Sequence, residues 1–340
     1  MSFVSRAIIA FEGAPLPDIV RKGAVSFLVG NVRRQLKHTP ADASARFAEE
    51  MRAHPIAAHT EDANAQHYEV PAEFFALCLG PRFKYSSCLY EAGDTLEKAE
   101  VRALQQTCAN AELADGQHIL ELGCGWGSMS LFMAARYPKA KITAVSNSAS
   151  QRAHIEASAA RQGLTNLRIV TADMNVFDTD ETFDRIVSVE MFEHMSNWRA
   201  LLERCRRWLK PDGRMLMHVF AHRTAPYRFD VNDPADWVAH HFFAGGVMPS
   251  RDLAANFPDL FTVEQEWWWN GKNYQQTALD WLKNFDANRD AIRKILAKVY
   301  GEDARLWENR WRLFFLATAG LFGHAGGNEW GVVHHRLKPA

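Results

Sequence analysis

Two carboxylates and an imidazole lie within five residues of one another, at Glu190, Glu193 and His194. They follow an apolar run, 183–189, that predicts a buried strand. An amine is protonated at neutral pH and must lose a proton before it can act as a nucleophile. His194 could accept that proton, and Glu193 could orient the imidazole or hold the amine. Glu190 adds negative charge, which favours a cationic substrate and stabilises an imidazolium. For an isolated cluster of this kind, a solvated surface loop is the alternative interpretation.

A glycine-rich turn follows the strand predicted at 118–122. Gly123, Gly125 and Gly127 come directly before a predicted helix, where free N–H groups and the freedom of glycine let a ligand approach the backbone. The dinucleotide fingerprint requires two residues between its second and third glycines, and this sequence has only one. Glu121 would repel a pyrophosphate but suits the ammonium group of an amino-acid cofactor. The turn therefore predicts an S-adenosylmethionine site in preference to a plain strand-to-helix connection.

Strand and helix patterns alternate through the middle of the chain. Apolar runs predict strands at 118–122, 141–145, 167–171, 183–189 and 214–220, with helical periodicity between them at 128–135, 150–162 and 198–209. Strands that alternate with helices of this length predict an α/β fold with a parallel sheet covered on both faces. Ligands of such sheets bind outside the carboxyl ends of the strands, so both clusters are expected at one edge.

The flanking segments have different patterns. Residues 1–89 are mostly helical in pattern, 222–250 is irregular, 277–322 is strongly helical, and 261–268 and 331–337 could each form a strand. These patterns divide the chain into a helical N-terminal cap (1–92), an S-adenosylmethionine-binding Rossmann-like core (93–220), a substrate-side insertion with the sixth strand and a helical region (221–325), and the last strand of the core sheet (326–340).

Composition excludes several classes of protein. Of 340 residues, 47% are hydrophobic and 23% are charged, which is the balance of a folded globular protein. The formal net charge is −1, so no overall field favours nucleic acid or an anionic membrane. The five cysteines are unclustered and lack metal-ligand spacing, which predicts a reduced, cytoplasmic protein without a metal site. The apolar segment 23–32 is too short to span a bilayer, so no stable membrane insertion is expected.

Five separated motifs resemble those of one branch of the class I S-adenosylmethionine-dependent methyltransferases. This branch holds the cyclopropane-fatty-acid synthases, the mycolic-acid methyltransferases and the plant coclaurine-type N-methyltransferases. The motifs occur in order at 66–71 (QHYEVP), 84–88 (KYSSC), 122–127 (LGCGWG), 145–148 (VSNS) with Gln151, and 191–195 (MFEHM). The resemblance covers about residues 60 to 340 and implies a Rossmann-like methyltransferase sheet with an N-terminal helical cap and helical insertions before the last strands.

The resemblance also implies ligand contacts at the motif positions. Tyr85 and Ser86 would close over the methionine end of S-adenosylmethionine, and Asp173 and Met174 would border its adenine. The full set of implied cofactor contacts is Tyr85, Ser86, Glu121, Gly123, Gly125, Ser146, Asn147, Gln151, Asp173 and Met174. The implied substrate contacts are Tyr68 and Glu69 from the cap, His218, and aromatic walls from Phe322 and Trp330. At any one of these positions, a capping, turn or core role is an equally good interpretation.

Two activities within this branch remain open. Glu190 matches the N-methyltransferases, whereas the lipid-modifying members typically have glycine at this position. Lipid cyclopropanation relies on a bicarbonate held by residues that match Cys88, Glu193, His218, the backbone near Phe220 and a tyrosine, and the tyrosine position falls at Leu282. We therefore expect an S-adenosylmethionine-dependent N-methyltransferase of a small aromatic or tetrahydroisoquinoline-like amine, with Glu190, Glu193 and His194 as catalytic residues. A lipid methyltransferase or cyclopropane synthase is the alternative, and a non-catalytic cofactor-binding protein is a third. A homodimer is compatible with the sequence.

Overall fold

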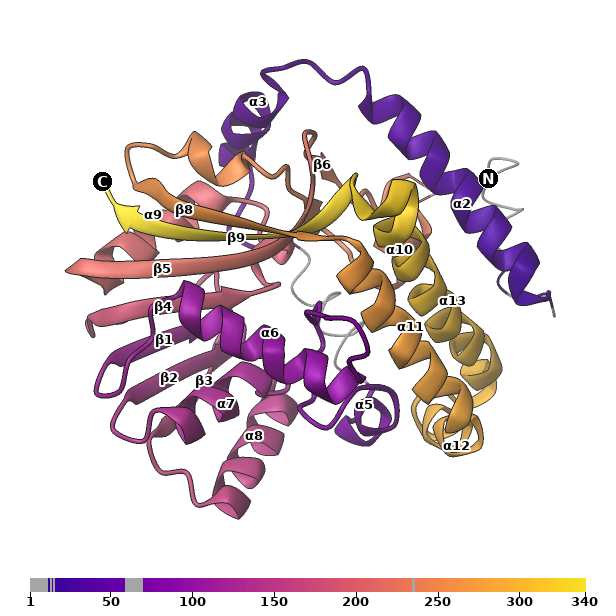
Figure 1. Ribbon diagram of the computed structural model, residues 1–340, viewed down its shortest axis with the longest axis horizontal. Helices are drawn as coiled ribbons and strands as arrows, with labels where there is room; N and C mark the ends of the chain where they lie inside the picture. Colours follow the sequence, from indigo (N-terminus) through magenta and orange to yellow (C-terminus); the bar gives the residue numbers. More distant parts are fainter. Residues whose placement is uncertain (1–11, 13, 15, 59–69, 234–235) are drawn as a thin grey trace.

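A seven-stranded sheet organises the fold, in the order β3-β2-β1-β4-β5-β9-β8 (Figure 1). The computed structural model describes residues 12, 14, 16–58, 70–233 and 236–340. The strands are β1 (His118–Leu122), β2 (Lys141–Ser146), β3 (Leu167–Thr171), β4 (Phe183–Val189), β5 (Leu209–His222), β8 (Phe261–Asn270) and β9 (Trp330–Pro339). The first five strands are parallel, and β9 runs antiparallel to both β5 and β8. The predicted α/β fold with a largely parallel sheet is confirmed.

Helices cover both faces of this sheet. They are α6 (Leu96–Asn110), α7 (Ser128–Arg136), α8 (Ala149–Gln162) and α9 (Trp198–Trp208). Side chains that alternate along β4 and β5 enter different apolar cores, as the period of a strand requires. Ile186 and Met215 pack with α9, whereas their neighbours Val187 and Leu216 pack with α6 and α7 on the opposite face. Figure 1 shows α6 in front of the sheet and α9 behind it.

A second group of helices stands beside the carboxyl ends of the parallel strands (Figure 1). It comprises α2 (Asp18–Leu36), α5 (Ala72–Cys78), α11 (Lys272–Ala287), α12 (Arg289–Tyr300) and α13 (Ala304–Gly323). Helix α13 contacts α2, α11 and α12, and α5 contacts α11 and α12. One apolar cluster, which includes Phe74, Trp281 and Trp311, fills the space between them. Across the described residues, no helix combines the length and apolarity that a membrane span needs.

The predicted and observed elements differ in three places. The irregular segment 222–250 contains a short strand pair, β6 (Tyr227–Arg228) and β7 (Val247–Met248), and the helix α10 (Trp237–His241). The helical segment predicted at 277–322 is three helices, interrupted at Asn288 and Gly301. The strand predicted at 214–220 is longer at both ends, since β5 spans Leu209–His222. The N-terminal part is helical as predicted, with α3 (Ala43–Glu50) and a 3₁₀ turn, η1 (Met51–Ala53), after α2. The strands β6 and β7 have only two residues each, which is too few for an alternating strand pattern to be recognised in the sequence.

Candidate active site

A cavity of about 1060 Å³ lies where the carboxyl ends of the parallel strands meet α2, α11 and α13. All ten positions predicted for the cofactor line it, although they come from four separate segments of the chain. Of the predicted catalytic and substrate residues, Glu190, His194 and Phe322 also line it. Tyr68 and Glu69 lie outside the described residues. One cavity thus combines the positions predicted for the methyl donor with two of the three predicted catalytic groups.

The glycine turn between β1 and α7 leaves open space for a ligand. Gly123, Gly125 and Gly127 have φ values of +80°, +51° and +84°, a region that side chains other than glycine rarely occupy. A Cβ atom added to Gly123 would collide with Cγ of Met191, so this glycine is required for packing. A Cβ atom added to Gly125 would meet no atom within 4 Å and would enter the cavity. The turn therefore presents backbone to the cavity at Gly125.

Glu121 supplies a buried carboxyl group beneath this turn. Only 2% of the residue is exposed, and the Ser130 hydroxyl donates a hydrogen bond to its Oε2. Burial raises the pKa of Glu121 to about 7. An ammonium group brought by a ligand would lower that pKa and restore the charge of the carboxylate. The buried carboxyl group of Glu121 therefore fits the ammonium group at the amino-acid end of S-adenosylmethionine.

The residues after β2 and β3 also have local structural roles. The Ser146 hydroxyl donates to Oε1 of Gln151 at 2.7 Å, and the Ser148 hydroxyl caps α8 by accepting from the Gln151 backbone N–H. Asp173 accepts from the Asn175 backbone N–H at 2.7 Å. These contacts fix the side chains at the edge of the cavity, so a capping role and a ligand contact are compatible at the same positions.

Glu190 is held at the end of β4 by three hydrogen-bonding groups. The Ser87 backbone N–H donates to its Oε1 at 2.8 Å, and Nε2 of His218 lies 3.2 Å from the same oxygen. The Tyr274 hydroxyl donates to Oε2 at 2.6 Å. Burial raises the pKa of Glu190, while the Lys84 charge and the Tyr274 and Ser87 hydrogen bonds lower it. Its backbone has a φ of +46°, which turns the chain out of the strand direction.

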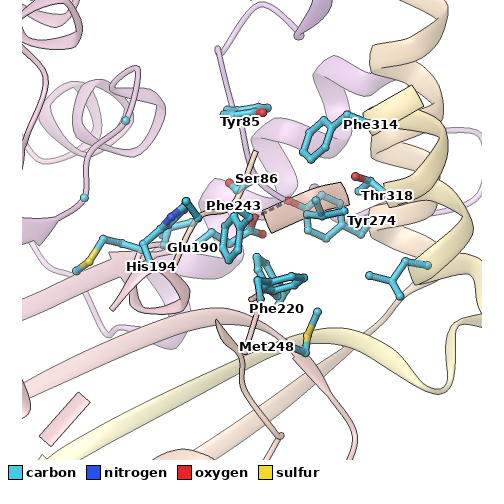
Figure 2. A pocket seen from close by; sticks show the side chains of 18 of the residues that line it. Tyr85, Ser86, Glu190, His194, Phe220, Phe243, Met248, Tyr274, Phe314 and Thr318 are labelled. Atoms are coloured by element: carbon cyan, nitrogen blue, oxygen red, sulfur yellow. Dashed lines mark hydrogen bonds between the residues drawn. The ribbon is translucent and has the colours of Figure 1, made fainter. Parts of the chain in front are cut away.

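Aromatic side chains line the part of the cavity nearest Glu190 and His194 (Figure 2). The His194 ring packs against Phe243 with centroids 4.3 Å apart, and the Tyr274 ring stacks on Phe322 at 4.3 Å. The remaining apolar lining here includes Phe220, Phe229, Trp237, Met248 and Phe314. Figure 2 shows Phe314 and Thr318 projecting from α13 toward this space. The wall is suited to an apolar molecule that carries a cation.

Three predicted site residues lie outside the cavity lining. Glu193 is fully buried, and its Oε1 accepts a hydrogen bond from the Phe220 backbone N–H at 2.6 Å. The His218 ring is directed at Glu190 and packs beside His334, with centroids 4.5 Å apart. Trp330 is buried in the helical cluster, and its Nε1 donates to the Tyr227 hydroxyl at 3.2 Å. From these positions each residue can influence a ligand only through a neighbour.

Sequence reasoning missed Lys84 and Tyr274, which both line the cavity beside Glu190. Lys84 precedes Tyr85 inside one of the recognised motifs, so the motif itself was a signal. Tyr274 is 84 residues from Glu190 and lies on α11, where nothing in the local pattern indicates a contact with β4. Only the packing of α11 against the sheet brings the two together.

The comparisons with known proteins agree with this architecture. The family model described as mycolic acid cyclopropane synthetase matches residues 57–325. An (S)-coclaurine N-methyltransferase from Thalictrum flavum subsp. glaucum is 34% identical over 294 residues, which cover 85% of this chain and 81% of that protein. A cyclopropane-fatty-acyl-phospholipid synthase from Escherichia coli K12 is 29% identical and covers 80% of this chain and 67% of its own.

A crystal structure of coclaurine N-methyltransferase bound to N-methylheliamine and S-adenosylhomocysteine gives a TM-score of 0.94. The two chains are 32% identical, and the match covers 99% of this chain and 100% of that one. The resemblance indicated by the five motifs is therefore confirmed over almost the whole chain. The chain belongs to the mycolic acid cyclopropane synthetase family of S-adenosylmethionine-dependent methyltransferases.

Proposed function

We propose that this enzyme transfers a methyl group from S-adenosylmethionine to the nitrogen of a bulky, largely aromatic amine. The observation that carries the proposal is a buried carboxylate, Glu190, in the aromatic wall of the cavity that contains the glycine turn. The curated N-methyltransferase relatives support the same reaction, since the most similar of those quoted above shares 34% of its residues with this chain. A cationic amine between aromatic rings and a carboxylate is a physically sound match.

The donor half of the cavity would be filled by S-adenosylmethionine, which supplies an already activated methyl group. Glu121 would hold the amino group, Gly123 and Gly125 would lie beneath the methionine portion, and Tyr85 and Ser86 would cover it. Ser146, Asn147 and Gln151 would contact the ribose, and Asp173 and Met174 would border the adenine. These residues fit the group because the turn leaves open space at Gly125 and because Glu121 is buried without a basic partner among the described residues.

On the acceptor side, Glu190 would bind the ammonium form of the amine and His194 would accept its proton before methyl transfer. The attacking nitrogen must lie in line with the methyl group, which makes catalysis mainly a matter of positioning. Phe243 and Phe322 would enclose the apolar part of the substrate. Glu193 would act from behind the wall, where it fixes the Phe220 backbone. We assign it a positioning role in place of the direct contact expected from the sequence.

The lipid alternative requires a bicarbonate site that these residues do not fit. The His218 Nε2 atom is paired with Glu190, and the Phe220 N–H is used by Glu193. Leu282 is buried in the apolar helical cluster and offers no hydroxyl. Cys88 directs its backbone N–H to the Thr277 hydroxyl and its thiol to the Ser86 carbonyl oxygen. The neighbouring carboxyl groups of Glu100 and Glu190 would also disfavour an anion. An amine is therefore the better acceptor for this cavity.

A methyl-transfer screen tests the proposal. Purified enzyme and S-adenosylmethionine are combined with primary, secondary and tertiary aralkyl amines and, separately, with phospholipid vesicles, and methylated products are identified by mass spectrometry. We expect products from amines, a roughly 10²–10⁴-fold lower kcat in His194→Ala, and a smaller loss in Glu193→Gln because the amide oxygen can still accept from Phe220. Glu190→Gln should act mainly through KM. Modified vesicle lipids without any methylated amine would contradict the proposal.

We also propose that the enzyme is cytoplasmic and forms a homodimer. All five cysteines are free and buried, which suits a reducing compartment. On α2, Ile19 and Phe27 expose 81% and 66% of their surface, and a second copy of the chain would cover them. Light scattering on the purified protein, which gives the mass in solution, distinguishes one copy from two.

A further inference from the structure

A lysine is buried in the wall of the substrate cavity. Lys84 is 2% exposed, and its Nζ donates to the Ser86 hydroxyl and, at 2.7 Å, to the Ser87 carbonyl oxygen. Among the described residues it forms no direct ion pair, since its hydrogen-bond partners are a hydroxyl and a carbonyl. A buried ammonium group is costly unless nearby charge compensates for it. In a cavity that binds a sulfonium and an ammonium, an additional cation requires a specific explanation.

The same turn that Lys84 holds also contacts Glu190. The Ser87 N–H donates to Oε1 of Glu190 at 2.8 Å, one peptide unit from the carbonyl group that Lys84 binds. The next residue is fixed as well, because the Cys88 N–H donates to the Thr277 hydroxyl at 3.0 Å. A single short turn therefore connects the buried cation to the buried carboxylate.

We infer that Lys84 is a positioning residue that keeps Glu190 ionised and correctly oriented for the substrate amine. Its charge balances that of Glu190 inside the cavity wall, and its two hydrogen bonds fix the turn whose N–H meets the carboxylate. The ammonium group directs two of its three donors at Ser86 and Ser87, so it acts on Glu190 through its charge and through the turn. This inference rests on the proposed amine-binding role of Glu190.

The electrostatics of the surrounding groups agree with this arrangement. Burial raises the pKa of Glu190, and the charge of Lys84 is the strongest interaction that lowers it again. Burial lowers the pKa of Lys84, while Cys88, Glu190 and Glu100 raise it. The titratable groups that face Glu190 are Lys84 and Cys88 on the turn, Glu193 on the loop after β4, His218 on β5 and Tyr274 on α11. Of these groups, Lys84 is the one whose side chain is ordinarily positively charged at neutral pH.

The inference is tested by titrating Glu190 directly, without a substrate. The full-length protein is labelled with ¹³C at the glutamate carboxyl groups, and the Glu190 signal is identified as the one lost in Glu190→Gln. In Lys84→Met we expect its titration midpoint to rise by roughly one pH unit or more, because an opposite charge nearby has been removed. Lys98→Met, an exposed lysine on α6, is the matched control and should leave the midpoint unchanged. Lys84→Gln is a second variant for the case in which Lys84→Met does not fold.

Steady-state kinetics give a second measurement, with an amine that the screen identifies as a substrate. Lys84→Met should raise KM for the amine about ten-fold with a smaller change in kcat, which is the expected effect of weakened cation binding. In a Glu190→Gln background the same substitution should add little, because the charge on which it acts is gone. An equal loss in both backgrounds would show a merely structural role and overturn the inference.

Two results would overturn the inference without reference to activity. One is an unchanged Glu190 midpoint in a folded Lys84 variant. The other is a titration of the wild-type protein in which Glu190 still carries its proton at neutral pH. This result can be obtained without any Lys84 variant. If the wild type methylates no amine, the proposed function fails, but the titration still decides whether Lys84 controls Glu190.

Discussion

The Tyr274 hydroxyl donates a hydrogen bond to Oε2 of Glu190 at 2.6 Å, which joins α11 to the end of β4 at the cavity wall. The opposite carboxylate oxygen is held by the Ser87 N–H. Both donors favour the charged form of Glu190, so they counter the burial that raises its pKa. The Tyr274 ring also stacks on Phe322, so the same side chain shapes the aromatic wall.

Tyr274→Phe should therefore lower kcat/KM for the amine by roughly ten- to hundred-fold, since hydrogen bonds to charged groups contribute about 1.5–3 kcal/mol. The variant keeps the ring and its stacking on Phe322. Loss of the donor raises the pKa of Glu190. As the pH is lowered, the variant should therefore lose activity at a higher pH than the wild type does. Steady-state kinetics between pH 5 and 9 measure both effects. A pH profile that coincides with that of the wild type would contradict the predicted link.

The two halves of the cavity differ in how far the sequence predicted them. Most of the predicted cofactor positions lie at or just after the carboxyl ends of β1, β2 and β3, and Tyr85 and Ser86 belong to a recognised motif. A local motif and the switch-point rule therefore suffice to predict them. The predicted ranges 167–171 and 183–189 coincide with β3 and β4, because short segments rich in β-branched residues between helical patterns indicate strands. The substrate half is built from contacts between segments that are distant in the sequence. The sequence pattern of an aromatic residue is also the same whether its side chain lines a pocket or packs in a core.

The orientation of the two glutamates could not be predicted either. After β4 the backbone leaves the alternation of a strand, because Glu190 has a positive φ and a 3₁₀ turn, η2 (Phe192–His194), follows it. No period then relates position 190 to position 193. The structure turns Glu190 toward the cavity and Glu193 toward the Phe220 backbone, which reverses the emphasis that the sequence placed on Glu193.

Gly125→Ala should weaken binding of S-adenosylhomocysteine by at least about ten-fold, since one methyl group would enter the space assigned to the cofactor. Isothermal titration calorimetry measures this affinity. A substitution at Gly123 is less informative, because its Cβ atom would collide with Met191 and disturb the fold.

Gly93→Ala is the control for backbone strain. Gly93 has a φ of +82°, and its Cβ atom would also meet no atom within 4 Å, but it does not line the cavity. Both variants should lose about 1 kcal/mol of stability, as expected for a non-glycine residue in the left-handed region. If the two variants bind S-adenosylhomocysteine equally well, Gly125 does not lie beneath the cofactor.

Glu193→Gln should become more stable than the wild type as the pH rises from 5 to 8. Burial, with a further contribution from Glu190, raises the pKa of Glu193 well above its ordinary value of 4.5. Above that ordinary value the unfolded chain releases the proton while the folded chain retains it, so wild-type stability falls as the pH increases. Glutamine does not titrate and can still accept from the Phe220 N–H. Thermal unfolding at several pH values gives the difference in Tm between the two proteins.

Glu97→Gln, at an exposed position on α6, is the matched control for replacing a glutamate by glutamine, and it should lack the gain in Tm with rising pH expected of Glu193→Gln. A flat difference for Glu193→Gln as well would mean that Glu193 is ionised in the folded protein. In that case a partner for its second carboxylate oxygen, which has none among the described residues, must be sought.

Amine methylation should be independent of bicarbonate. The Phe220 N–H and the His218 Nε2 atom are engaged by Glu193 and Glu190, and Cys88 directs its backbone N–H to the Thr277 hydroxyl and its thiol to the Ser86 carbonyl oxygen. Among the described residues, the groups expected to hold the anion are therefore already engaged. Initial rates are compared in carbon-dioxide-free buffer with and without added bicarbonate. The Escherichia coli cyclopropane synthase, assayed in the same two buffers, serves as the control from the lipid-modifying branch. A methylation rate that collapses in carbon-dioxide-free buffer and recovers on addition of bicarbonate would contradict the prediction. It would show that the anion displaces one of these hydrogen bonds, and the lipid reaction would again be a candidate.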